Sequence, residues 1–225
     1  MHLFRYETHA HTCETSPCGK VNACDLVRQY KEIGYHGIVI TDHYYNEYFE
    51  KLGDISWEDK IQEYLKGYRA ALAEGRKIGV VVFLGMELRF ESNWNDYLVY
   101  GLNEEILLRN PELYRMTLEE FRELADREQL LIYQAHPFRK GMTVTRTDCL
   151  DGIEAFNGNP RHNSNNTLAY LFARENNLKI LSGSDYHQPQ DAARGGIEVE
   201  EELKTSEELV AYLKEKKETR LMAIF

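Results

Sequence analysis

Histidine and carboxylate side chains follow short apolar runs at five places in this 225-residue chain. A catalytic zinc takes three protein ligands and keeps one position for water. A larger number of ligands therefore predicts two or three divalent ions, and a mixed imidazole and carboxylate set suits zinc, manganese or iron. Glu87 is the natural bridging ligand, because each of its oxygens can bind one ion. The seven candidate metal ligands are His9, His11, His43, Glu87, His136, Asp185 and His187.

The spacing of these residues supports one shared site. His9 and His11 are two residues apart, and so are Asp185 and His187. In an extended segment, side chains at positions i and i+2 point the same way, so each pair can reach one cavity. A single histidine after an apolar run is more often an ordinary core or surface residue. Because buried ionisable groups are unfavourable unless they are paired or metal-bound, the repetition favours a metal centre.

Strand and helix patterns alternate along the chain, which is typical of parallel βα units. The catalytic groups of such a barrel lie at the C-terminal ends of its strands. The pattern yields about seven units, one short of an eightfold barrel, in a single domain over residues 1–225. Strands are predicted at 2–8, 37–41, 80–84, 97–101, 130–135, 152–156 and 179–183, with closing strands at 197–199 and 220–224. Helices are predicted at 21–34, 57–78, 117–128, 161–176 and 206–217.

The composition narrows the class of protein. The formal net charge of −10 disfavours extended nucleic-acid binding, which usually needs a basic face. No apolar run approaches the ~20 residues that a membrane span requires. The four cysteines form no CxxC pair, and the first motif starts too close to Met1 to leave room for a signal peptide. We therefore expect a cytoplasmic protein with no membrane association.

Three basic side chains are candidates for binding a substrate phosphate. Arg161 lies in an asparagine-rich loop, residues 157–163, that follows a predicted strand. A guanidinium matches the geometry of a phosphate, although a solvated arginine at a helix start is the plainer interpretation. Arg139 and Lys20 are candidates of the same kind.

An aromatic segment follows the second predicted strand. Its rings could stack on a base or a sugar, which would indicate a nucleotide substrate, or they could pack together as a lid. The aromatic residues of this segment are Tyr44, Tyr45, Tyr48, Phe49 and Trp57.

The motifs resemble those of the polymerase and histidinol phosphatase (PHP) family and follow one another in that family's order. The resemblance spans nearly the whole chain. It implies a distorted, TIM-like (β/α)7 barrel of the α/β class, with a cluster of two or three metal ions and a metal-activated water that hydrolyses a phosphoester. The matching segments are His9-Ala10-His11-Thr12, Thr41-Asp42-His43, Gly85-Met86-Glu87, Ala135-His136-Pro137 and Gly183-Ser184-Asp185-Tyr186-His187.

The resemblance also implies a division of the ligands among three metals. His9, His11, Glu87 and Asp185 look like ligands of a first ion, Glu87 and His136 of a second, and His43 and His187 of a third.

Two positions depart from the family's pattern. The family often carries a histidine or aspartate shortly after its first motif, where this chain offers Glu14 or Cys18. It often has another histidine on the strand after the glutamate motif, where Asp96 is the nearest ligand type. These three residues are further candidate metal ligands.

We expect a phosphoesterase that acts on a small phosphate ester, such as a nucleotide or a sugar or amino-alcohol phosphate. Glu87, Asp185 and His187 are the candidate catalytic residues, and Asp185 or His187 could protonate the leaving oxygen. The same ligands could instead hydrolyse a C–N bond, or the chain could be a metal-binding module without activity. The amphipathic helix at 206–217 could pack on the barrel or form a dimer contact, so the oligomeric state stays open.

Overall fold

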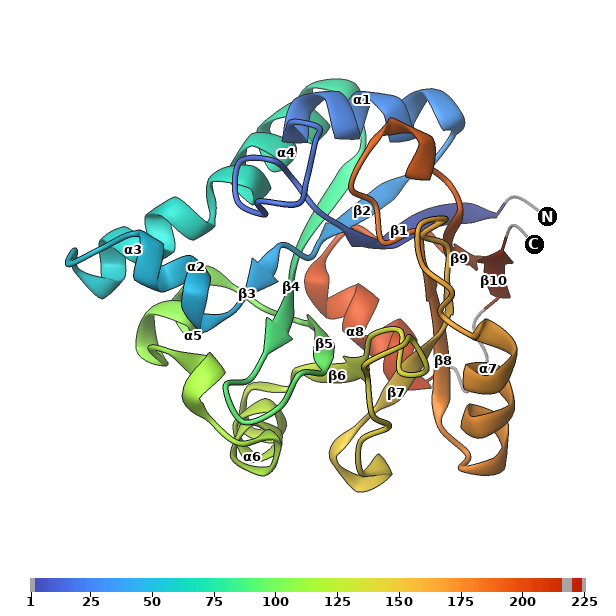
Figure 1. The fold of residues 1–225 in the computed structure, drawn as a ribbon. Helices are drawn as coiled ribbons and strands as arrows, with labels where there is room; N and C mark the ends of the chain where they lie inside the picture. Colours follow the sequence, from blue (N-terminus) through green and yellow to red (C-terminus); the bar gives the residue numbers. More distant parts are fainter. Residues whose placement is uncertain (1–2, 216–219, 224–225) are drawn as a thin grey trace.

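The β-sheet of the protein curls until its two ends nearly meet (Figure 1). The structure, a computed structural model, describes residues 3–215 and 220–223. Residues 2, 216, 217 and 224, which fall in predicted elements, lie outside the described residues.

The strands of the sheet follow one another in a single series, except that the short strand β3 (His43–Tyr44) pairs with β4 outside it. In spatial order that series is β10 (Arg220–Ala223), β9 (Gly195–Val199), β1 (Phe4–Ala10), β2 (Gly37–Ile40), β4 (Val81–Arg89), β5 (Asp96–Tyr100), β6 (Leu131–Gln134), β7 (Gly152–Asn157) and β8 (Lys179–Gly183).

The barrel closes where β8 returns to β1. Ala10 forms an isolated parallel bridge with Tyr186. The backbone N–H of His11 donates to the Tyr186 carbonyl at 3.0 Å, and the N–H of Tyr186 donates to the His9 carbonyl at 3.1 Å. The predicted distorted, TIM-like α/β barrel is therefore confirmed. The extent of the domain, residues 1–225, stays a prediction.

Two strands, β5 and β9, run against the expected parallel pattern, and β9 is antiparallel to both β1 and β10. β5 is antiparallel to both β4 and β6, whereas β1, β2 and β4 are mutually parallel and so are β6, β7 and β8. Residues 90–95 join β4 to β5 directly, and a connection this short cannot hold the crossover that a parallel pair requires. The expectation of parallel strands throughout is therefore wrong at β5 and also at β9.

The helices begin and end largely where local signals place them. Asn22 caps the first helix by accepting the N–H of Asp25, and Gly34 ends it at φ 92°. Thr117 and Glu120 form the predicted capping box. The helices are α1 (Ala23–Ile33), α2 (Asn46–Lys51), α3 (Trp57–Tyr64), α4 (Lys66–Ile78), α5 (Glu104–Arg109), α6 (Leu118–Glu128), α7 (Asn166–Glu175) and α8 (Ser206–Glu215).

Two predicted helices have different bounds in the structure. The long helix at 57–78 is interrupted at Leu65, so that α3 and α4 are separate. The helix at 161–176 begins only at Asn166, because the asparagine side chains of the preceding loop bind backbone groups. The side chain of Asn166 itself accepts the N–H of Asn157 and donates to its carbonyl. The short helices α2 and α5 were not predicted.

The aromatic segment after β2 is mostly part of the core. Tyr44, Tyr48 and Phe49 are buried, and the ring of Phe49 packs on Trp57 and stacks against Tyr114. These buried rings pack together, as one of the two interpretations expected, and do not offer a surface on which a base or a sugar could stack. Tyr45 and Trp57 are only half-buried, and of these two Trp57 packs on Phe49.

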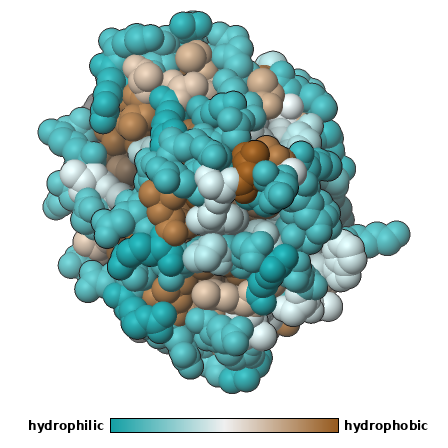
Figure 2. All heavy atoms as spheres, turned by 90° about the vertical axis from the view of Figure 1, so that its left-hand side faces the viewer, coloured by the Kyte–Doolittle hydropathy of each residue, from teal (hydrophilic) through white to brown (hydrophobic). Residues whose placement is uncertain are grey.

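Side chains on the outer face around α2 and α3 are mainly hydrophilic, with separate hydrophobic patches between them (Figure 2). Leu209, Val210 and Leu213 of helix α8 pack into the core beneath the strands. This is the packing on the barrel that was one of the two alternatives for this helix. Within residues 3–215 and 220–223, no helix has the length and apolar character to cross a bilayer.

Candidate metal centre

The seven predicted ligands converge at one end of the barrel. His9 and His11 come from the end of β1, and Asp185 and His187 follow β8, which lies beside it. His43 opens β3 and is in register with Glu87 of β4. His136 follows β6. His9, His11, Glu87, His136 and Asp185 are at most 2% exposed, whereas His43 and His187 are half-buried.

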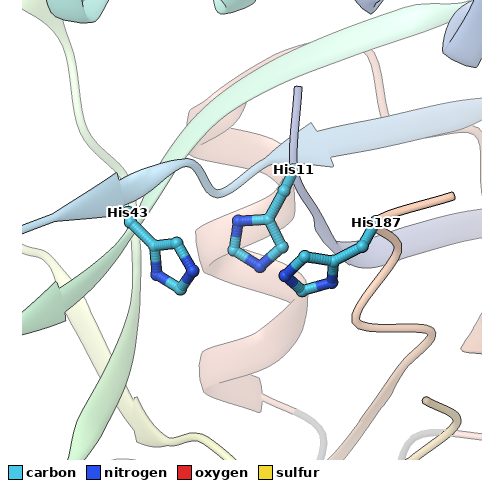
Figure 3. Close-up of side chains that lie close together, drawn as sticks. All are labelled: His11, His43 and His187. Carbon is cyan, nitrogen blue, oxygen red and sulfur yellow. The ribbon is translucent and has the colours of Figure 1, made fainter. Parts of the chain in front are cut away.

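Three groups of side chains bring ligand atoms within 4.8 Å of one another among the described residues. The first contains His9, His11 and Asp185, and the second contains Glu87, Asp96 and His136. The third contains His11, His43 and His187, whose imidazoles lie side by side in Figure 3. The ring of His11 is 4.4 Å from each of the other two, measured between centroids. His11 thus belongs to two groups and links them.

Glu87 stands between these groups. Its Oε1 lies 3.1 Å from Nε2 of His136 and 3.4 Å from Nε2 of His9. Its Oε2 lies 2.7 Å from Nδ1 of His43 and 3.4 Å from Nε2 of His11. Each carboxylate oxygen therefore faces two different imidazoles, which is the geometry that a bridging ligand needs.

The residues present fit a cluster of divalent cations. Nε2 of His9 and Nε2 of His11 are buried and have no hydrogen-bond partner among the described residues. A buried polar atom without a partner loses its hydration free energy and gains nothing in return. A cation between these imidazoles and the carboxylates of Glu87 and Asp185 would satisfy both nitrogen atoms.

Two of the ligands, Glu87 and His11, have pKa values shifted toward the forms that bind metal. Burial acts to raise the pKa of Glu87, but His43 and His9 lower it well below its usual value. Burial and the neighbouring His187 and His43 lower the pKa of His11 well below its usual value. An ionised carboxylate and a neutral imidazole are the forms that bind metal.

Two buried carboxylates that the sequence reasoning missed orient the ligands. Oε1 of Glu154 lies 2.8 Å from Nδ1 of His9, which leaves Nε2 of that imidazole for the cluster. Oε2 of Glu154 accepts the backbone N–H of His136 and the side-chain amide of Asn157. The available signal was a lone charged residue inside an otherwise uncharged strand, residues 152–157.

Glu7 is the second of these carboxylates. Its Oε1 accepts the backbone N–H groups of Thr8, His9 and Ser184, and its Oε2 accepts the hydroxyl of Tyr30. Because it is fully buried, burial raises its pKa. Glu7 thus ties the end of β1 to the segment that carries Asp185.

Asp42 fixes the loop that follows β1. It accepts the backbone N–H and the hydroxyl of Thr12, and the hydroxyl of Ser16, each at 2.7 Å. Ser16 in turn accepts the backbone N–H of His43 at 3.0 Å. Burial raises the pKa of Asp42 to about 6. The first two ligand motifs are thereby held in one network.

Of the three further candidate ligands, only Asp96 belongs to one of the three groups of ligand atoms. Asp96 joins the group of Glu87 and His136, but both of its oxygens also bind arginine side chains. Burial acts to raise the pKa of Cys18, but hydrogen bonds with His187 and His43 lower it to about 6. Glu14 lies outside the three groups, because its carboxylate accepts the N–H of Ala23 at the start of α1.

A cavity of about 350 Å³ lies above the cluster, and all three predicted phosphate-binding residues line it. Arg161 also pairs with the fully buried Asp191, through Nη1 and Nη2 at 2.6 and 2.7 Å. Lys20 and Arg139 line the same cavity, with Arg139 3.3 Å from Asp96. Arg89, which was not predicted, completes this set of basic side chains.

The family model described as PHP domain matches residues 7–216. The chain belongs to the PHP family. This membership confirms the resemblance that the sequence motifs indicated, to a family of metal-dependent phosphoesterases.

Several solved structures share the fold at low sequence identity. A two-domain protein from Bacteroides vulgatus, containing a predicted PHP-like metal-dependent phosphoesterase, is 16% identical with a TM-score of 0.69. The match covers 99% of this chain and 65% of that protein, so this chain spans about two thirds of its length. PsfC from Pseudomonas syringae is 17% identical with a TM-score of 0.68, over 100% of this chain and 93% of PsfC.

A third similar structure is an amidohydrolase from Chromobacterium violaceum with bound sulfate and no metal. It is 14% identical with a TM-score of 0.58, over 92% of this chain and 96% of that protein. Comparison with curated proteins found no match. At these identities the solved structures support the fold.

Proposed function

We propose that the protein is a metal-dependent phosphoesterase that hydrolyses a small phosphate ester, a nucleotide or a sugar or amino-alcohol phosphate. The observation that carries the proposal is a buried group of metal ligands beneath a cavity lined by Lys20, Arg89, Arg139 and Arg161. A cavity of about 350 Å³ and a net charge of −10 favour a small soluble substrate over a nucleic-acid polymer and over a membrane surface. We also retain the proposal of a cytoplasmic location.

Bound zinc, manganese or iron would supply a water of lowered pKa and a positive charge beside the phosphoryl group. His9, His11, Glu87, His136 and Asp185 would hold two ions, and His43 and His187 would hold a third. Arg89 and Arg139 can stabilise negative charge on the phosphoryl oxygens. Nδ1 of His187 lies 2.8 Å from the carbonyl of Asp185, which leaves Nε2 to bind an ion or to protonate the leaving oxygen.

Hydrolysis of a C–N bond is the second candidate function, because one protein of similar fold is named an amidohydrolase. The basic lining of the cavity favours a phosphate, since an amide group itself carries no charge for these side chains to bind. A metal-binding module without activity is the third.

Hydrolysis assays on the purified protein, loaded with manganese or zinc, separate these functions by measuring the phosphate released from esters and the amine released from amides. The panel contains p-nitrophenyl phosphate, nucleotides, sugar phosphates and simple amides. We expect phosphate release that Glu87→Ala abolishes together with most metal binding, while circular dichroism stays that of the parent. Glu58→Ala, an exposed position on α3, is the matched control. Hydrolysis of amides alone, bound metal without turnover, or full activity of Glu87→Ala would each overturn the proposal.

A further inference from the structure

A second cavity, of about 280 Å³, adjoins the cavity of the metal centre. Arg89 lines both cavities, so a molecule bound at the metal centre can extend past this side chain into the second space. The proposed mechanism assigns no role to this space. Its lining residues are Tyr45, Asn46, Glu47, Arg89, Phe90, Glu91, Asn93 and Trp94.

The register of β3 and β4 builds this second cavity directly onto the metal site. His43 is paired with Glu87, and Tyr44 is paired with Leu88. Tyr45 therefore follows beside Arg89, and the Arg89 guanidinium carbon is 5.9 Å from the centroid of the Tyr45 ring. The ring of Tyr45 is also 5.7 Å from that of His43. Tyr45 lies two residues after the ligand His43, so a substrate that extends outward from the metal site along β3 and β4 reaches its ring.

Trp94 forms another part of the lining, on the connection between β4 and β5. Its side chain is 75% exposed, the largest value among the exposed hydrophobic side chains described. The chain's other tryptophan, Trp57, packs on Phe49 and donates Nε1–H to the carbonyl of Leu107. Trp94 gains no comparable burial, whereas an indole face is a good stacking surface for a base.

The polar side chains of the second cavity favour an uncharged nucleobase over an anionic group. Glu47 and Glu91 bring carboxylates, and Asn46 and Asn93 bring amides. Carboxylate and amide oxygens accept hydrogen bonds from the ring N–H and amino groups of a nucleobase. The same carboxylates would repel a second phosphate group. The cavity therefore suits an uncharged base better than another anionic group.

We propose that this second cavity binds the nucleobase of a nucleotide, against Tyr45 and Trp94, while Arg89 and the metal centre receive its phosphate. The placement of the phosphate rests on the proposed function, whereas the binding of the base does not. The substrate class is then a nucleoside monophosphate in preference to a sugar or amino-alcohol phosphate.

Tryptophan fluorescence tests binding of the base without any turnover. In the Trp57→Phe variant, Trp94 is the single tryptophan, because the chain contains two. We expect adenosine and AMP to quench its emission and ribose 5-phosphate to leave it unchanged. In the Trp94→Phe variant the same titration of adenosine should produce no quenching. An unchanged Trp94 signal at saturating AMP would overturn the proposal.

Substrate selectivity provides a second test that does not depend on Trp57→Phe. The ratio of kcat/KM for AMP to that for ribose 5-phosphate should fall about 10-fold in Trp94→Ala, since one base stack contributes roughly that factor. Tyr170→Ala removes a different exposed aromatic residue and should leave the ratio unchanged. An unchanged ratio in Trp94→Ala would contradict the proposal.

The two proposals fail in distinguishable ways. Quenching by adenosine without phosphate release from any ester would retain the base site and overturn the phosphoesterase function. Phosphate release with equal rates on AMP and ribose 5-phosphate, and without quenching, would retain the phosphoesterase and overturn the base site.

Discussion

His9 shows how strongly a single candidate ligand depends on residues far away in the chain. Its Nδ1 lies against Glu154, while its Nε2 faces Glu87 and Asp185 at 3.4 and 3.5 Å. Burial acts to lower the pKa of His9, but the carboxylates around it, above all Glu154, raise it well above its usual value. The orientation of this imidazole is therefore set by a residue that would not itself touch the metal.

Glu154→Gln tests this orienting role. The amide has nearly the shape of the carboxylate but loses its charge, so we expect metal affinity to fall by about 10- to 100-fold with the fold retained. Isothermal titration with zinc or manganese measures the affinity, and Glu207→Gln, an exposed position on α8, is the control. An affinity equal to that of the parent would show that Glu154 has no such role.

Asp96 can be either a metal ligand or an anchor for two arginines. Its oxygens bind Arg89 at 2.7 and 3.0 Å and Arg139 at 3.3 Å, whereas Nε2 of His136 is 3.8 Å away. These distances favour the anchor.

We therefore expect Asp96→Asn to raise KM for a phosphate ester by about 10-fold, a loss comparable to one charged hydrogen bond, with the metal content unchanged. Steady-state kinetics and elemental analysis of the same preparation provide both readouts. A parallel loss of bound metal would instead identify Asp96 as a ligand, and Glu119→Gln on the surface of α6 is the control.

At the scale of elements, α4 approaches the loop after β1 unusually closely. A Cβ atom on Gly67 would overlap Oγ1 of Thr12 and lie 2.9 Å from Oδ2 of Asp42. This position needs glycine for space, because any side chain would displace the network that holds the first two ligand motifs.

Gly67→Ala should lower the free energy of unfolding by about 1–3 kcal/mol through this overlap, even though alanine favours helix. Urea denaturation measures the change, and Lys66→Ala at the neighbouring exposed position is the control. If Gly67→Ala is as stable as the parent, the close approach of α4 does not constrain the loop.

At the scale of the whole molecule, the barrel closes around the metal centre. The bridge between Ala10 and Tyr186 joins β1 to the segment that follows β8, beside the ligands that both carry. An ion bound there would connect segments from both ends of the chain and would have no equivalent site in the unfolded protein. Bound metal should therefore stabilise the native state.

Removing the metal should lower Tm, and adding zinc or manganese should restore it. Free metal at about 100 times its Kd contributes roughly 2.7 kcal/mol to the stability of the folded state. Scanning calorimetry of the protein with and without a chelator measures this effect. Glu87→Ala should show a smaller shift. Equal Tm values with and without chelator would rule out a metal centre of this kind.

Motifs of residues close together in the chain predicted the candidate metal ligands and the barrel. His9 with His11, and Asp185 with His187, are close in the chain, so their shared direction follows from backbone geometry alone. The alternating apolar runs indicated the barrel for the same reason, since burial of a strand is readable within a few residues. The closed sheet confirms the barrel, and the family model confirms the resemblance that the motifs indicated.

Other features were decided only by tertiary structure. The contact between His9 and Glu154 joins residues 145 positions apart, and no local pattern reports such a pairing. The direction of β5, the burial of Tyr44 and Phe49, and the place of Arg89 between two cavities likewise depend on how distant segments pack. The local sequence determined which groups could bind metal, because that is a property of side chains and their spacing. The fold determined which groups orient them and what lies beside them, because those contacts exist only once the barrel has closed.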